Sequence, residues 1–259
     1  MILEEQITRR LGKTHIDYRF HIYDSLLSSN DLAKEMIKSD DNCAGTVIIA
    51  NTQTAGRGRK SRTFSSPKGG LYISIVFSGE QLINKQQYVL FAPGVAVCIT
   101  LEKLLGIKPQ IKWPNDILLE DKKICGILTE ILKCADDEHI IIGIGVNYST
   151  RQDLFPKEIQ STAGSLEKYI GKLTINEFIA VLIKTMDSIN ASFSTERYIA
   201  EYKERMGILG KDIVVLENEK RINATAIDLC DDGGLVIRKN EGVEKIYAGD
   251  VSIRKAVKF

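Results

Sequence analysis

The pattern of apolar residues changes once along this chain, near residue 208, and this change constrains the fold more than any other feature. Before it, strand-like and helix-like segments alternate without internal repeats. After it come short β-type segments separated by turn residues such as Asp231–Gly234; the segments are Ile213–Leu216, Ala224–Leu229, Leu235–Ile237 and Val243–Tyr247. About fifty residues of short strands fit a small β-barrel that needs a neighbour to bury its core. We therefore expect two domains, residues 1–208 and 209–259.

The first 208 residues combine strand and helix patterns. Apolar runs bounded by turn residues predict strands at Thr46–Ala50, Leu71–Phe77, Ile111–Trp113, Ile117–Leu119, Ile124–Leu132 and His139–Val146. Apolar spacing and polar caps predict helices after Ser28–Asp31, at Gln87–Leu105, after Thr174 and around Tyr198–Met206. Thr174 and Glu177 have the spacing of a capping box.

Composition and charge narrow the class of protein. The chain has 259 residues, 44% hydrophobic, and a formal net charge of +1. It can bury a core, but it lacks the overall positive field of a dedicated nucleic-acid binder. Its five cysteines are scattered without a Cys-x-x-Cys pair, and its three histidines lie far apart. These patterns predict no disulfide framework, zinc site or histidine catalysis.

The sequence gives no sign of export or membrane insertion. Residues 1–5 lack the basic and apolar regions of a signal peptide. The longest apolar run, Val89–Ile99, contains Pro93 and Gly94, which we expect to interrupt it well short of a membrane span. We therefore expect a cytoplasmic protein with reduced cysteines and no membrane partner.

The segment Gly56–Arg62 combines glycines with four cationic side chains, at positions 57, 59, 60 and 62. Glycine lets backbone N–H groups approach a ligand closely, and a guanidinium offers forked donors that match phosphate or carboxylate oxygens. An RNA-binding segment or a solvated loop has the same composition. Against a nearly neutral background, the local charge favours a small anionic ligand.

Three further polar motifs lie at predicted strand ends or tight turns. They are Lys112–Asp116, Lys123–Leu128 and Gly143–Asn147. Each has an ordinary explanation as a turn, a solvated lysine or glycines that relieve crowding in a strand. Together with the basic loop, they suggest one pocket.

These motifs, in this order, resemble those of the biotin protein ligases, and the resemblance runs from about Ser28 to Arg254. The similar segments are Gln53–Arg62, Lys112–Asp116, Lys123–Leu128, Gly143–Asn147 and, near the end, Ala248–Arg254, which is similar to the closing motif of an SH3-like domain. The resemblance implies a mixed α+β catalytic domain, with a largely antiparallel sheet and packed helices, followed by an SH3-like barrel.

The resemblance also implies a reaction in two steps. Biotin and MgATP give biotinyl-5′-AMP and pyrophosphate, and the ε-amine of a lysine on a biotin carboxyl carrier protein then takes the biotinyl group. ATP with Mg²⁺ and biotin are substrates, and no tightly held prosthetic group is implied. Because a carboxylate and a phosphate are both anions, Lys123, Arg59 and Arg62 are the catalytic candidates.

The remaining site residues are implied in the same way. Biotin contacts map to Ser28, Ser29, Gln53, Gly56, Arg57, Phe64, Lys123 and Gly126. Nucleotide contacts map to Arg59, Arg62, Lys112, Asn115, Asp116, Asn147 and Arg254. Asp116 is also the candidate Mg²⁺ contact. Ser28 and Ser29 have a second explanation as helix caps.

The sequence departs from the family pattern at two places. Phe64 stands where the family usually has a tryptophan, and Trp113 is the only tryptophan of the chain. Ala163–Leu166 reads Ala-Gly-Ser-Leu in place of Ala-Thr-Ser-Leu. Only 27 residues precede Ser28, so we expect the ligase-only form without sequence-specific DNA binding. Monomer and homodimer both stay open.

Two alternatives remain from the sequence. Lipoate protein ligase shares the fold and the chemistry of acid activation, but Gly56–Arg59 and Lys112–Asp116 argue against it. A non-catalytic RNA-binding module would use the basic loop and the barrel, but it leaves Lys123, Asp116 and Asn147 without a role.

Overall fold

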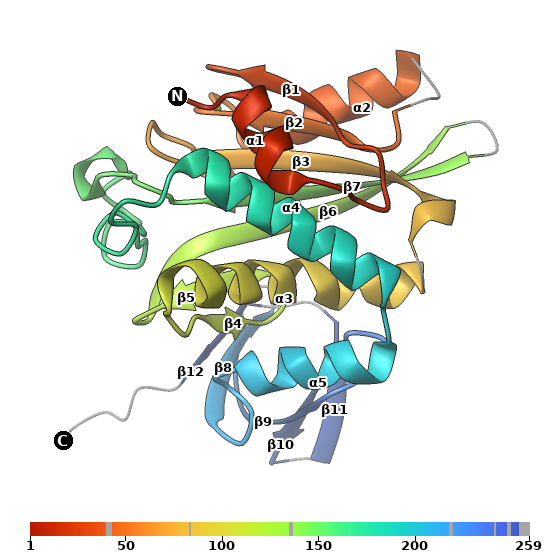
Figure 1. Cartoon of the computed structure of the whole chain (residues 1–259). Helices are drawn as coiled ribbons and strands as arrows, with labels where there is room; N and C mark the ends of the chain where they lie inside the picture. The colour runs from red at the N-terminus through yellow and green to blue at the C-terminus, as the bar shows by residue number, and fades with distance from the viewer. Residues whose placement is uncertain are drawn as a thin grey trace.

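A seven-stranded sheet forms the centre of the first 208 residues (Figure 1). The computed structural model describes residues 1–39, 43–82, 84–134, 137–217, 220–240, 242–247 and 250–253. The sheet order is β1-β2-β3-β7-β6-β5-β4, with strands β1 (Arg19–Tyr23), β2 (Thr46–Ala50), β3 (Leu71–Ser78), β4 (Gln110–Lys112), β5 (Asp116–Leu119), β6 (Lys122–Cys134) and β7 (Asp137–Val146). β1 and β2 are parallel, and the other neighbours are antiparallel. The predicted mixed, largely antiparallel sheet is confirmed.

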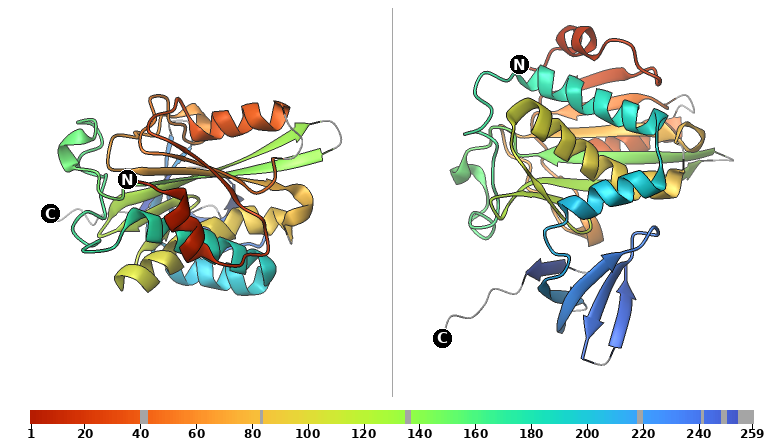
Figure 2. Two further views of the ribbon diagram at one scale, coloured as in Figure 1. Left: turned by 45° about the horizontal axis from the view of Figure 1, so that its top comes forward. Right: turned by 60° about the horizontal axis from the view of Figure 1, so that its bottom comes forward.

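Helices cover both faces of the sheet. Helix α2 (Ser29–Ser39) packs on one face, while α1 (Glu4–Leu11), α3 (Lys85–Leu105) and α4 (Ile175–Ala191) lie on the other (Figure 2, left). All five residues of β2 are therefore buried. Strands covered on both faces become apolar throughout, which explains the continuous apolar run at Thr46–Ala50.

Helix α3 is the core helix of this domain. Among the described residues it is the one helix long and apolar enough to cross a membrane, but 61% of its most apolar window is buried inside the protein. The predicted helix at Gln87–Leu105 is confirmed by α3, but the expectation that Pro93 and Gly94 cut the apolar stretch short of a membrane span is wrong. Burial against α4, α5 (Thr195–Arg205) and the sheet offsets the backbone hydrogen bond that proline removes.

A second, five-stranded sheet follows α5 and projects from the first domain (Figure 2, right). It is antiparallel with the order β11-β10-β9-β8-β12; the strands are β8 (Asp212–Glu217), β9 (Lys220–Leu229), β10 (Leu235–Lys239), β11 (Gly242–Ile246) and β12 (Asp250–Ile253). This confirms the expected C-terminal β domain. A salt bridge of 2.6 Å joins Lys203 of α5 to Asp228 of β9.

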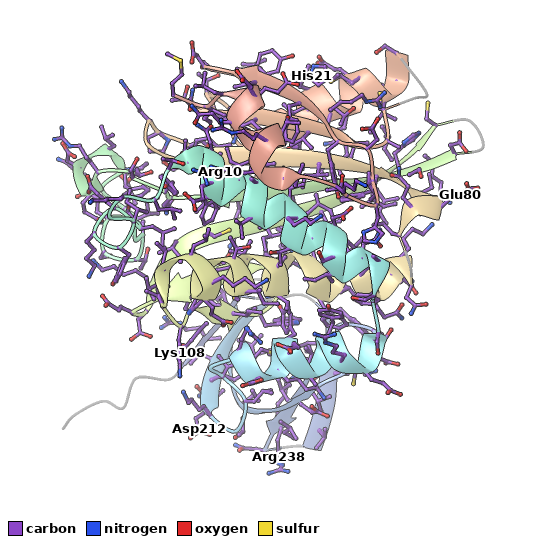
Figure 3. All side chains as sticks on the ribbon, in the orientation of Figure 1. Arg10, His21, Glu80, Lys108, Asp212 and Arg238 are labelled. Atoms are coloured by element: carbon purple, nitrogen blue, oxygen red, sulfur yellow. The ribbon has the colours of Figure 1, made fainter. Side chains whose placement is uncertain are left out.

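The N-terminal segment, for which the sequence patterns predicted no helix or strand, is held against α4 by polar contacts. Arg10 of α1, labelled in Figure 3, lies 3.6 Å from the carboxylate of Glu177. Further along, the buried carboxylate of Asp187 accepts hydrogen bonds from the backbone N–H groups of His15 and Ile16 at 3.0 and 3.1 Å. Asp187 therefore fixes the chain as it enters β1.

Replacing Asp187 with alanine should lower the free energy of unfolding by about 3 kcal/mol, because two backbone donors lose their acceptor. Urea denaturation measures this change. Ser188→Ala is the control on the same helix, since its exposed hydroxyl bonds only to the backbone of Lys184 among the described residues, and it should change the free energy of unfolding by less than about 0.5 kcal/mol. Equal stability of the two variants would contradict the anchoring role.

Candidate active site

A cavity of about 150 Å³ opens beside the first turn of α2, under the loop between β2 and β3. The loop, α2 and strands β5, β6 and β7 all contribute to its wall. Eleven of the residues that the sequence nominated line it: Ser28, Ser29, Gln53, Arg57, Arg59, Arg62, Phe64, Asn115, Asp116, Lys123 and Gly126. Three others, Gly56, Lys112 and Asn147, are not among its lining residues. Arg254 lies outside the described residues.

The neutral end of the cavity is built from hydroxyls and one amide. Ser28 caps α2, since its Oγ accepts from the N–H of Asp31 at 3.3 Å. The N–H and Oγ–H of Ser29 both donate to Oε1 of Gln53, at 2.7 and 3.0 Å. The Nε2 of Gln53 in turn donates to Ser66 at 3.0 Å. These contacts orient the amide, so this end presents both donors and acceptors to a ligand.

Asn30 extends this polar wall and is bonded to the buried Ser74, and neither residue was predicted as a site residue from the sequence. The Oγ–H of Ser74 donates to Oδ1 of Asn30 at 2.5 Å, and Asn30 lines the cavity. A Cβ at Gly143 would lie 2.3 Å from that same Oδ1, so a glycine is required where β7 passes Asn30. The glycine pattern of Gly143–Asn147 was the signal that could have pointed to Asn30.

Phe64 lies inside the cavity over two facing glycines. Gly126 of β6 and Gly145 of β7 are register partners. A Cβ on Gly126 would lie 2.7 Å from Cε2 of Phe64, and one on Gly145 would lie 2.5 Å from Cε1. Because neither glycine has a side chain, a flat space remains over Gly126 and Gly145. We call this space the slot, and the ring of Phe64 fills it.

Lys123 meets Asp116 in the middle of the cavity wall. The Nζ of Lys123 lies 2.6 Å from Oδ1 of Asp116 and 5.3 Å from the ring centroid of Phe64. The turn before Asp116 is fixed to β6, because Nδ2 of Asn115 donates to the carbonyl of Ile127 at 2.6 Å. The Lys123 side chain is 35% exposed, so its ammonium can reach a ligand.

Asn147 supports this lysine from behind rather than lining the cavity. It is 4% exposed, and its Nδ2 donates to the carbonyls of Lys123 at 3.2 Å and Gly164 at 2.7 Å. Its Oδ1 has no hydrogen-bond partner within the described part of the chain. Lys112 lies on β4 as the register partner of Asp116.

The basic loop carries its charges at the cavity rim. Arg57 forms an ion pair of 2.5 Å with Asp31 of α2, and this hydrogen bond holds the pKa of the guanidinium above its ordinary value. Lys60 and Ser61 have φ values of 54° and 57°, a left-handed conformation that is unfavourable for residues other than glycine. This turn keeps Arg59 on the cavity wall.

A buried thiol, that of Cys125, and one carboxylate, that of Asp116, lie near Lys123. Burial raises the pKa of the Cys125 thiol, which therefore stays protonated beside Lys123. Across the described ranges, no three His, Cys, Asp or Glu side chains gather as metal ligands. Asp116 is the one carboxylate on the cavity wall among the residues described. One carboxylate fits Mg²⁺ that arrives on nucleotide phosphates and keeps most of its water.

Comparison with known proteins identifies this arrangement. Residues 23–147 match the Biotin/lipoate A/B protein ligase family, and residues 208–254 match the Biotin protein ligase C terminal domain. The fold and the cavity thus define a protein of the biotin and lipoate ligase class. The bifunctional ligase/repressor BirA of Bacillus subtilis is 31% identical over 250 residues, which cover 93% of this chain and 76% of that protein. The chain belongs to the biotin protein ligase family.

Other relatives agree with this assignment. The biotin–[acetyl-CoA-carboxylase] ligase of Mycobacterium tuberculosis is 26% identical over 216 residues, covering 80% of this chain and 78% of that protein. The biotin protein ligase of Aquifex aeolicus, solved in complex with biotin and ATP, superimposes with a TM-score of 0.73 at 28% identity, covering 92% of this chain and 99% of that one. The family resemblance seen in the sequence motifs is confirmed.

Because the ring of Phe64 fills the slot, we expect Gly145→Ala and Phe64→Ala to have coupled effects on the free energy of unfolding. Gly145→Ala alone should lower the free energy of unfolding by about 1–3 kcal/mol, because the new Cβ overlaps the Phe64 ring. In the Phe64→Ala background this penalty should largely disappear, which a double-mutant cycle by urea denaturation measures.

Gly94→Ala is the matched control for this cycle, since its Cβ would lie 3.5 Å from Tyr202 at ordinary contact distance. Its effect should be the same with and without Phe64. If the effects of Gly145→Ala and Phe64→Ala on the free energy of unfolding were fully additive, this would contradict the contact between Phe64 and Gly145.

Proposed function

We propose that this cavity activates biotin with ATP and passes the biotinyl group to a lysine of a biotin carboxyl carrier protein. The observation that carries the proposal is the distribution of charge along one cavity. Neutral donors and acceptors of Ser29 and Gln53 line the same cavity as the cationic side chains of Arg59, Arg62 and Lys123. Such a cavity suits a ligand with a neutral ring, which both donates and accepts hydrogen bonds, and a carboxylate tail.

In the first step, a carboxylate oxygen of biotin attacks the α-phosphorus of ATP. The bond from that phosphorus to the bridging oxygen of pyrophosphate breaks, and biotinyl-5′-AMP forms. Arg59, Arg62 and Lys123 stabilise the negative charge that gathers where the two anions meet. In the second step, the lysine amine attacks the acyl carbon, loses a proton, and releases AMP.

During the reaction, the ammonium of Lys123 exchanges its ion pair with Asp116 for one with the ligand. Its ammonium is paired with Asp116 at 2.6 Å in the structure described here. An incoming carboxylate or phosphate competes for that ammonium, and its attraction grows once the loop covers the cavity and excludes water. Asp116 thus holds Lys123 in place before the ligand arrives, and its freed carboxylate then faces the Mg²⁺ that enters with the phosphates.

Phe64 and the basic loop move to admit both substrates. The cavity of about 150 Å³ is smaller than the roughly 300–1,000 Å³ of ordinary ligand pockets. The Phe64 ring occupies the slot over Gly126 and Gly145, so its displacement creates room for the flat biotin ring or its chain. Once ligands are bound, the loop that carries Arg57 and Arg59 covers the adenylate and limits its hydrolysis.

Four further residues belong to the proposed nucleotide site. Asn115 lines the cavity next to Asp116. Lys112 and Arg254 are nucleotide contacts by family resemblance. Asn147 is a nucleotide contact by family resemblance, and in this structure it acts through the backbone of Lys123. We also propose that the ligase domain comprises residues 1–208, that residues 209–259 form an SH3-like domain, and that the protein works in the cytoplasm.

Biotin is favoured over lipoate as the acid. The M. tuberculosis and A. aeolicus relatives are both named for biotin, and the polar wall of Ser29, Asn30 and Gln53 matches a ureido ring better than the apolar dithiolane of lipoate. An RNA-binding role is less favoured, because the basic loop lines a cavity together with Asp116 and Asn115.

Lys123→Gln should reduce the rate of biotinyl-5′-AMP formation by about a hundredfold or more, because it removes the cation at the reacting oxygens. Mass spectrometry of the adenylate, with pyrophosphate release, measures this rate for biotin, lipoate and octanoate in parallel. Lys133→Gln is the matched control, since Lys133 is an exposed lysine of the same strand, and it should react like the wild type. Lipoyl-5′-AMP as the sole product would contradict the choice of acid, and no adenylate with any acid would contradict the activity.

A further inference from the structure

One hydrogen bond joins the C-terminal sheet to the turn that carries Asn115 and Asp116. The indole Nε1–H of Trp113 donates to the carbonyl oxygen of Gly233 at 3.1 Å. Trp113 is 3% exposed, so the donor of this bond is shielded from water and the bond holds its geometry more firmly than a fully exposed one. The two residues are 120 positions apart in the sequence, and each belongs to a different sheet-bearing domain.

The side chain of Asp232 organises the turn on the C-terminal side of this bond. Its carboxylate accepts from the N–H of Gly234 at 3.0 Å, from Nζ of Lys245 at 2.9 Å and from the hydroxyl of Tyr247 at 2.8 Å. The Lys245 hydrogen bond is the largest of the contacts that lower the pKa of Asp232 to about 2, so the carboxylate stays charged at neutral pH. Gly233 itself has a φ of +80°, which favours glycine there.

The turn on the other side of Trp113 leads directly to the catalytic lysine. The hydroxyl of Tyr202 donates to the carbonyl of Pro114 at 2.7 Å. The Nδ2 of Asn115 donates to the carbonyl of Ile127 in β6. The next residue, Asp116, pairs with Lys123 at 2.6 Å. A displacement of Trp113 would therefore move the carboxylate that sets the position of the Lys123 ammonium.

A second cavity, of about 330 Å³, connects these two turns with the site. Its wall contains Trp113, Asp232 and Gly233, and it shares Arg59 and Asn115 with the first cavity. The organised turn of the C-terminal domain thus faces the same interior as the cationic loop. Side chains at this boundary have a role in arranging the site as well as in joining two domains.

We propose that Asp232 is a positioning residue for adenylate formation, which acts by holding the carbonyl of Gly233 against Trp113. This inference rests on the proposed function. Asp232 touches no substrate in this account, and its effect passes through Trp113 to the Asp116–Lys123 pair. Because reacting groups misplaced by about 1 Å lose up to about a hundredfold in rate, a loosened turn lowers kcat while biotin, held from the α2 side by Ser29 and Gln53, keeps its KM.

Trp113 reports this contact directly, because it is the only tryptophan of the chain. Asp232→Asn keeps the shape of the side chain and removes its charge, so the turn should loosen and water should reach the indole. The emission of Trp113 should shift to longer wavelength, and acrylamide should quench it more strongly. Glu244→Gln is the matched control, because the carboxylate of Glu244 pairs with Lys239 in the same domain, whereas that of Asp232 pairs with Lys245, and it should leave both signals unchanged.

Kinetics of adenylate formation test the consequence for the site. Asp232→Asn and Trp113→Phe should each lower kcat by about tenfold or more, with the KM for biotin within about twofold of the wild type. The double variant should be no slower than Trp113→Phe alone, because both changes break one contact. Glu244→Gln should match the wild type, and equal unfolding midpoints of the variants would exclude a general loss of stability.

The outcomes separate this inference from the proposed function. Unchanged Trp113 fluorescence in Asp232→Asn would overturn the inference, as would rate losses that multiply in the double variant or a wild-type kcat in Asp232→Asn. A wild-type protein that forms no adenylate would overturn the proposed function, and the positioning role with it, even where the fluorescence shift shows that Asp232 holds Trp113.

Discussion

The ion pair between Asp116 and Lys123 is the interaction on which the rest of the site depends. Lys123 lies near the start of β6 and Asp116 begins β5, so the pair joins two neighbouring strands at the proposed reaction site. The pair is partly exposed, with side-chain exposures of 35% and 21%. Such a pair adds little to stability, so its value lies in holding an ammonium ready for exchange with a ligand.

Glycines near this pair leave room for a cavity beside an otherwise closely packed sheet. Strands β6 and β7 are bare where Gly126 faces Gly145, and a third glycine, Gly143, makes room for Asn30. Larger residues at these positions would fill the space with their own side chains. Helix α3 and the turn at Asp232 and Gly233 line the second cavity, which shares Arg59 and Asn115 with the site cavity.

Much of this arrangement could be predicted from the sequence, and the exceptions have physical reasons. The strand Thr46–Ala50 has the predicted bounds, because burial on both faces leaves an uninterrupted apolar signal. The basic loop, Asn115, Asp116 and Lys123 share a wall because each lies at or next to the end of a strand of one sheet. β1 escaped prediction, since Arg19–Tyr23 is a partly exposed edge strand with a mixed pattern. The inward position of Phe64, the burial of Asn147 and the bond from Trp113 to Gly233 are tertiary contacts, and no local pattern encodes them.

The central claim is that this cavity joins a carboxylate oxygen of biotin to the α-phosphorus of ATP. Labelling of the biotin carboxylate with oxygen-18 tests it most directly, with mass spectrometry of the phosphate-containing products after transfer to a carrier lysine. Attack at the α-phosphorus leaves one labelled oxygen in AMP, because the acyl carbon–oxygen bond breaks when the amine takes the biotinyl group. Label in orthophosphate, or unlabelled AMP after complete transfer, would contradict the account.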